Sequence, residues 1–178
     1  MKRSTWKTYA LWILLSEGVG ALSGWLTREG LRVYPDALAR PALSPPAAVF
    51  PVVWVLLFAL MGAGAARVAL SPSSPARSRG LRLFLVQLAV NFFWSLLFFN
   101  RQAFGLAFLW LLLLWFLILR MILVFRAADP PAALLQIPYL LWVTFAAYLN
   151  LGVWLLNRSS APIPALTSAL CRFLPELF

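Results

Sequence analysis

A chain of 178 residues that is 63% hydrophobic and only 11% charged has too little polar surface to stay in water, because a soluble globular domain carries about 25% charged residues. The composition therefore excludes a soluble domain and indicates an integral membrane protein. The net charge is +10, but the Lys and Arg residues stand beside apolar runs, which is typical of membrane topology. They do not gather on one face or in one tail, so we expect no nucleic-acid partner.

Five apolar segments follow one another along the chain, each close to the roughly 20 residues that a helix needs to cross a bilayer core. They cover residues 9–26, 47–70, 83–99, 103–125 and 132–156. Backbone in lipid must satisfy its own hydrogen bonds, and the segments lack the alternating polarity of barrel strands, so we predict helices. The first segment is long for a signal peptide and resembles the others, which favours a retained helix. The predicted fold class is an all-α integral membrane bundle of five transmembrane helices.

The connections between these segments differ in character. Residues 27–46 form the longest one, which ends in a proline-rich stretch, and residues 71–79 are small and polar, as in a solvated turn. The other connections are short, so neighbouring helices should be antiparallel. Residues 1–157 thus form one membrane domain. Residues 158–178 form a tail too short to span, either amphipathic on the membrane surface or disordered.

Lys and Arg are nearly balanced between the two ends of the predicted bundle, so the orientation in the membrane stays open. The chain contains no histidine and one cysteine, Cys171, so we expect neither a metal site nor an internal disulfide. The same lack leaves acid–base catalysis without its usual groups. We therefore expect no required cofactor and no conventional enzyme.

Polar residues at membrane depth are costly, so each of them requires a reason. Glu17 lies near the middle of the first segment among small residues. It is either a hydrogen-bonded packing carboxyl or a group with a proton-relay or ligand role. In the third segment Gln87, Asn91 and Trp94 fall at i, i+4 and i+7, which places two amides and an indole on one stripe facing protein.

Aromatic residues share helical faces with such amides in two further segments. Trp54 and Phe58 are four residues apart, and Trp142 and Ala146 stand on one face with Asn150. Indole and phenyl faces with a few amides suit a flat apolar ligand carrying some polar atoms. Ordinary core packing explains the same spacing, so the residues alone leave both interpretations open.

Several motifs of the chain resemble those of the TspO/MBR family, the translocator proteins and tryptophan-rich sensory proteins. The first is Glu29-Gly-Leu-Arg-Val-Tyr34, followed by Arg40-Pro-Ala-Leu-Ser-Pro-Pro46 and by Pro51, Trp54 and Phe58 in the second segment. Gln87-Leu-Ala-Val-Asn91-Phe-Phe-Trp94-Ser-Leu-Leu-Phe-Phe99 and Pro138-Tyr-Leu-Leu-Trp142 resemble the motifs of the third and fifth helices. The similarity covers roughly residues 10–157.

This resemblance implies a five-helix bundle, often a homodimer, with a pocket beneath the first loop for porphyrins, such as protoporphyrin IX or haem, and for similar flat apolar drugs. It also implies the lining residues. Carried over by motif, the ligand-binding residues are Trp54, Phe58, Asn91, Trp94, Trp142 and Ala146, with Tyr34, Pro41 and Pro45 in a lid over residues 27–46. The expected function is a membrane receptor for tetrapyrroles with a regulatory or transport role.

Two departures from the family pattern bear on alternative functions. Val33 and Leu43 stand where the family usually has tryptophan, which removes two indoles near the lid from any light-dependent degradation of porphyrin. Leu151 and Leu155 stand where the sterol motif of animal members has tyrosine and arginine, so motif-based sterol recognition has little support. A light-dependent porphyrin-degrading enzyme and a tetrapyrrole or sterol transporter are the alternatives to a receptor.

Overall fold

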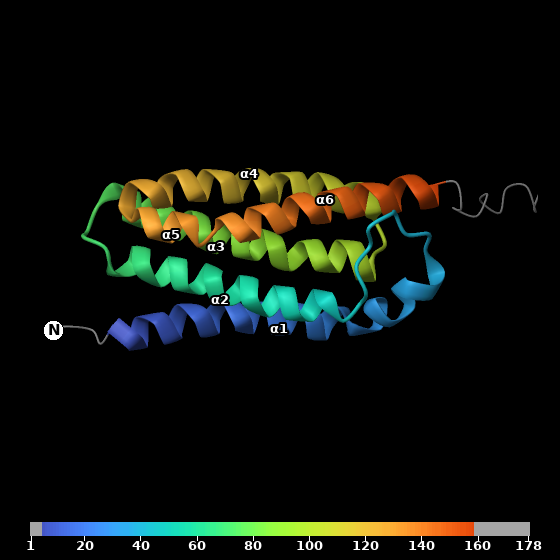
Figure 1. The fold of residues 1–178 in the computed structure, drawn as a ribbon, viewed down its shortest axis with the longest axis horizontal. Coiled ribbons are helices and arrows are strands. Elements are labelled where there is room, and N and C mark those ends of the chain that lie inside the picture. The colour runs from blue at the N-terminus through green and yellow to red at the C-terminus, as the bar shows by residue number, and fades with distance from the viewer. Residues whose placement is uncertain (1–4, 159–178) are drawn as a thin grey trace, which may run out of the picture.

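The computed structural model describes residues 5–158, and within them all side chains except those of residues 32–37. The described part is a helical bundle (Figure 1). Its elements are α1 (Thr5–Ala37), α2 (Val49–Leu70), α3 (Pro75–Ser95), the π-helical turn η1 (Leu96–Asn100), α4 (Phe104–Ala128), α5 (Pro130–Leu134) and α6 (Ile137–Asn157). Five helical spans in it are long and apolar enough to cross a membrane, which confirms the predicted fold class. The predicted tail, beyond Arg158, lies outside the described residues.

The helices pack as successive antiparallel neighbours. α1 packs mainly against α2, α4 packs against α3 and α6, and η1 contacts α1 (Figure 1). The α1–α2 contact is a backbone contact, because a Cβ added at Gly62 would lie 2.5 Å from the Cα of Ile13 and 2.7 Å from the carbonyl oxygen of Trp12. Small residues at such a crossing let helices approach closely where lipid offers no hydrophobic driving force.

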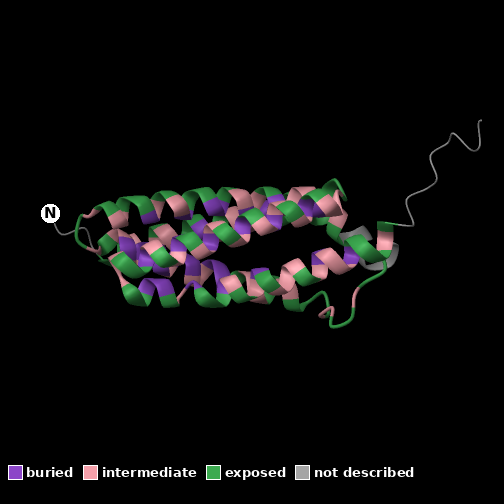
Figure 2. Ribbon diagram, turned by 90° about the horizontal axis from the view of Figure 1, so that it is seen from above, coloured by how far each residue is buried: buried purple, intermediate pink, exposed green. Residues whose placement is uncertain are grey.

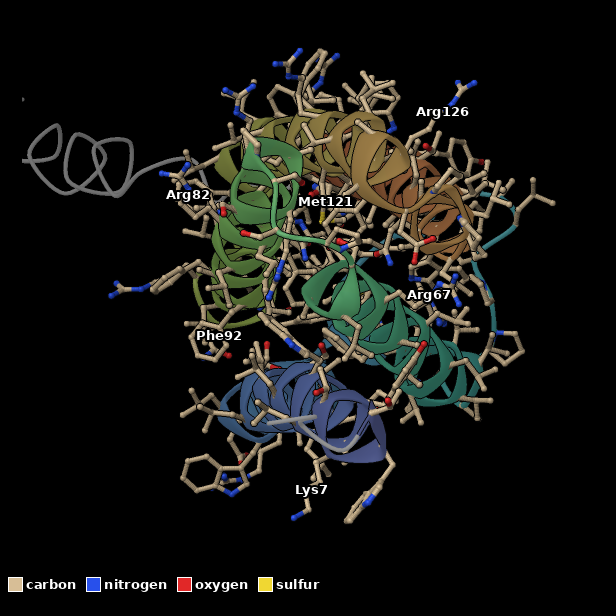
Figure 3. All side chains as sticks on the ribbon, turned by 90° about the vertical axis from the view of Figure 1, so that its left-hand side faces the viewer. Lys7, Arg67, Arg82, Phe92, Met121 and Arg126 are labelled. Atoms are coloured by element: carbon tan, nitrogen blue, oxygen red, sulfur yellow. The ribbon has the colours of Figure 1, made fainter. Side chains whose placement is uncertain are left out.

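The tightest core lies toward the end of the bundle that holds the start of α1. Met61, Phe84 and Met121 are fully buried there, and buried positions lie along several helices (Figure 2). Figure 3 looks onto this end and shows Met121 inside the ring of helices, with Lys7 and Arg126 pointing outward. In the described part of the chain these buried side chains fill this half of the bundle.

The first helix is longer than predicted. It continues past residue 26 to Ala37, although the apolar span itself ends at Leu31. Charged residues end a membrane span but not a helix, and Arg28 even supports the helix by pairing with Glu29 and donating to the Trp25 carbonyl oxygen. The connection between the first two helices therefore shrinks to residues 38–48.

Two other boundaries also differ from the prediction. α3 begins inside the supposed turn, because the Ser74 hydroxyl caps it by accepting from the Arg77 backbone N–H at 3.1 Å, and Pro75 follows the cap. Serine at the cap and proline at the first helical position form a standard start signal. The fifth span divides into α5 and α6, with a turn before Pro138. The ion pair of Arg67 and Asp129, 2.9 Å apart, ties α2 to the start of α5.

Candidate functional site

A cavity of about 530 Å³ lies in the half of the bundle that faces the loop between α1 and α2. Its walls come from α1, α2, α3 with η1, and α6, and residues 38–48 contribute its cover. The volume falls in the range of roughly 300–1,000 Å³ that is typical of small-molecule sites. The lining is mostly apolar, with few polar groups, which is the usual composition of such a site.

Most of the residues predicted for the site line this cavity. They are Trp54, Phe58, Asn91, Trp94, Trp142, Ala146 and Pro45. Pro41 does not line it but packs on α6, where a Cβ added at Gly152 would lie 2.5 Å from the Pro41 Cβ. The side chain of Tyr34 lies outside the described residues.

Flat aromatic faces line opposite walls of the cavity. Trp54 and Phe58 stack with their ring centroids 5.4 Å apart on α2, and Trp94 stacks on Phe98 at the same separation. Trp142 of α6 meets Phe50 edge to face at 5.9 Å. The spacing of four residues places the rings side by side in the first two pairs, and the packing of α2 against α6 brings Trp142 to Phe50.

The amides of the third and fifth spans have two different roles. Asn150 is a packing residue: its Oδ1 accepts from the Trp94 indole N–H at 3.3 Å, and its Nδ2 donates to the Phe104 carbonyl oxygen at 2.9 Å. Asn91 is only 3% exposed, lines the cavity, and has an Nδ2 without a hydrogen-bond partner within the described residues. Asn91 is therefore the amide left open for a molecule in the cavity.

The residues of the predicted polar stripe on the third span thus lie in two different environments. Asn91 and Trp94 reach the cavity, whereas Gln87 lies in the core below it, where its Oε1 accepts from the Tyr139 hydroxyl at 3.0 Å. One helical turn separates Gln87 from Asn91, and that turn marks the boundary between core and cavity on α3.

The loop that covers the cavity is fastened to α6 at three points. The Asn157 amide exchanges two hydrogen bonds with the Ala39 backbone, at 3.0 and 2.9 Å. The Tyr148 hydroxyl donates to the Ala42 carbonyl oxygen at 2.8 Å, and Pro41 packs on Gly152. The lid, predicted over residues 27–46, is therefore residues 38–48 together with their anchors on α6.

Several lining residues were missed from sequence. The phenyl rings Phe50, Phe98 and Phe99 belong to the same aromatic walls, and the last two stood unremarked within the motif of the third helix. Arg40 of the lid also lines the cavity, and its position between the apolar run and the prolines gave no local signal of that. Among the side chains that the structure describes, no cluster of three or more His, Cys, Asp or Glu could hold a metal ion.

Spanning helices around a ligand-sized cavity define a helix-bundle membrane protein with a site between its helices. The TspO/MBR family matches residues 12–155. The chain is 37% identical over 151 residues to the tryptophan-rich protein TspO of Chlorobaculum tepidum, with 84% of this chain and 96% of the relative covered. It is 38% identical to protein CrtK of Rhodobacter capsulatus, covering 72% and 81%, and 35% identical to the translocator protein of Ovis aries, covering 75% and 80%. The chain belongs to the TspO/MBR family and is an integral, multi-pass membrane protein.

Proposed function

We propose that the cavity binds a flat, largely apolar molecule of the porphyrin class, and that the protein is a membrane receptor for it with a regulatory or transport role. The observation that carries this proposal is the set of aromatic faces around one cavity: Trp54, Trp94 and Trp142 come from three different helices and line the same space. Stacking on such faces favours a planar ring system, and the open amide of Asn91 would orient it.

The lid adds a charge that suits this ligand class. Arg40 lines the cavity, and within the described residues no hydrogen bond or ion pair occupies its guanidinium. A porphyrin with carboxylate substituents would place them toward Arg40, where a guanidinium and a carboxylate form charge-assisted hydrogen bonds. The same arrangement keeps the apolar part of the ring between the aromatic walls.

Two features bear on what happens to the bound molecule. The half of the bundle below the cavity is closed by Met61, Phe84 and Met121, all fully buried, which favours binding and signalling over open passage. The relatives named translocator protein and tryptophan-rich sensory protein fit a transport or a regulatory role, respectively. Flux of protoporphyrin IX into proteoliposomes separates the two, and product formation on illumination tests the degrading-enzyme alternative.

Binding itself is tested by titrating the purified protein with protoporphyrin IX and following the porphyrin absorbance, a readout that tryptophan substitutions do not disturb. Trp142→Ala should weaken binding about three- to tenfold, because one stacking contact is worth about 0.5–1.5 kcal/mol. Asn91→Ala should weaken it by a similar factor.

The matched control is Trp6→Ala, since Trp6 is 67% exposed and lies outside the cavity. It should leave the affinity unchanged. Equal affinities for Trp142→Ala, Asn91→Ala and the unmodified protein would show that the ligand does not occupy this cavity.

A further inference from the structure

Only two charged side chains line the cavity within the described residues: Arg40 in the lid and Glu17 on α1. Glu17 is half-buried, and no ion pair or hydrogen bond to its carboxylate occurs within the described part of the chain. A carboxylate at membrane depth is costly and normally pairs with another group. The residues whose side chains the structure describes supply no such partner for Glu17.

Two further polar groups around the same cavity are also left open. The Nδ2 of Asn91 and the hydroxyl of Ser23 are buried, line the cavity and have no hydrogen-bond partner among the described residues. Buried polar groups in native structures are nearly always satisfied, so a set of three open ones around one space points to a molecule that satisfies them. The amide of Asn91 offers both a donor and an acceptor.

The positions of the two charges give the cavity a direction. Glu17 precedes Thr27, another lining residue, by about 15 Å along α1, because each helical residue adds about 1.5 Å. Arg40 lies beyond the end of α1, in the lid. The carboxylate is therefore at the deep end and the guanidinium at the covered end, with the aromatic walls between them. Gly20 and Ala21, which follow Glu17 on α1, line the same cavity.

We propose that Glu17 determines specificity, so that the cavity prefers flat aromatic or macrocyclic ligands that carry a cationic or N–H-donating group on the edge that enters first. An ammonium or protonated ring nitrogen would pair with the Glu17 carboxylate, and the open Nδ2 of Asn91 would donate to an acceptor on the ring system. An acidic group on the opposite edge would face Arg40. This inference rests on the proposed function, because it concerns the same cavity, and it adds a charge requirement at the deep end.

Two matched probes test the charge preference. 9-Aminoacridine is a planar cation at neutral pH, and acridine is its largely neutral counterpart with the same ring system. Binding of each is measured by quenching of tryptophan fluorescence in non-ionic detergent. The unmodified protein should bind the aminoacridine at least about tenfold more tightly than acridine, the ratio expected for one charge-assisted hydrogen bond.

Glu17→Gln and Glu17→Leu should both abolish the preference while retaining acridine binding. Glu29→Gln is the matched control, because it removes the same charge from a carboxylate that does not line the cavity. Glu29→Gln should keep the preference for 9-aminoacridine over acridine. This control distinguishes direct contact with Glu17 from the effect of the protein's net charge.

Each alternative result overturns the inference. Equal affinities for the two probes in the unmodified protein, or an equal loss of preference in Glu29→Gln, would remove Glu17 as the determinant. If protoporphyrin IX binds but neither acridine does, the charge requirement fails while the proposed function stands. If none of the three molecules binds, both fail together.

Discussion

The lid of the cavity offers a quantitative test, because one side chain holds it by two hydrogen bonds. The Oδ1 of Asn157 accepts from the Ala39 backbone N–H at 3.0 Å, and its Nδ2 donates to the Ala39 carbonyl oxygen at 2.9 Å. Asn157→Ala removes both bonds at the last residue of α6. Alanine is the strongest helix former, so the helix itself should persist.

The size of the effect follows from the exposure of these bonds. A typical hydrogen bond contributes about 0.5–1.5 kcal/mol net, and exposed bonds such as these belong in the lower half of that range. Their joint loss should therefore cost about 1–2 kcal/mol, which shifts the opening equilibrium of the lid about 5- to 30-fold. Tyr148→Phe removes only the bond to the Ala42 carbonyl oxygen and should shift it by less.

Hydrogen–deuterium exchange of the peptide covering residues 38–48 measures this opening directly, because the Ala39 N–H is one of the bonded groups. Exchange should accelerate in the order unmodified protein, Tyr148→Phe, Asn157→Ala, and bound protoporphyrin IX should dissociate faster in the same order. Exchange in α2 should stay unchanged. A wild-type exchange rate at Ala39 in Asn157→Ala, or an equal acceleration throughout the bundle, would refute the idea of a separately fastened lid.

Two predictions concern the packing beneath this lid. Asn150→Leu should lower the free energy of unfolding by about 1–3 kcal/mol, because it leaves the Trp94 indole N–H buried without a partner and removes the bond to the Phe104 carbonyl oxygen; thermal unfolding in detergent measures it, and an unchanged midpoint would contradict the assignment. Gly62→Ala should also destabilise the bundle by about 1–3 kcal/mol, since the added methyl group would meet the backbone of α1, whereas Gly18→Ala, with open space around it, should not. Equal unfolding midpoints for these two variants would show that α1 and α2 are not in backbone contact at Gly62.

Much of the fold was predictable because it depends on local properties. The apolar runs predict five spans, and the period of the α-helix places Trp54 beside Phe58 and Trp142 beside Ala146 from their spacing alone. The end of the first helix was misplaced for a physical reason: hydropathy marks where a segment leaves the lipid, and a helix can continue into water, as α1 does to Ala37.

The depth of each polar residue was decided by the tertiary structure. Gln87 and Asn91 are both amides on one stripe of α3, yet the first bonds Tyr139 in the core and the second is open to the cavity. Side chains from neighbouring helices fill the space around Gln87 but leave a cavity beside Asn91. No local sequence pattern on α3 encodes this difference. The anchoring of Ala39 by Asn157 joins residues 118 positions apart and is likewise invisible to spacing.

By itself, the sequence determined that the chain crosses a membrane as helices and which residues share a helical face. Apart from the polar stripe of the third span, only the tertiary structure decided which faces point inward. Leu109 and Leu111 of α4 are the same residue type two positions apart, and the first is 62% exposed while the second is 1% exposed. In a water-soluble protein the exposed position would usually carry a polar residue and the buried position an apolar one. In a bilayer the lipid and the protein interior are equally apolar, so composition does not distinguish them, and packing alone assigns each face.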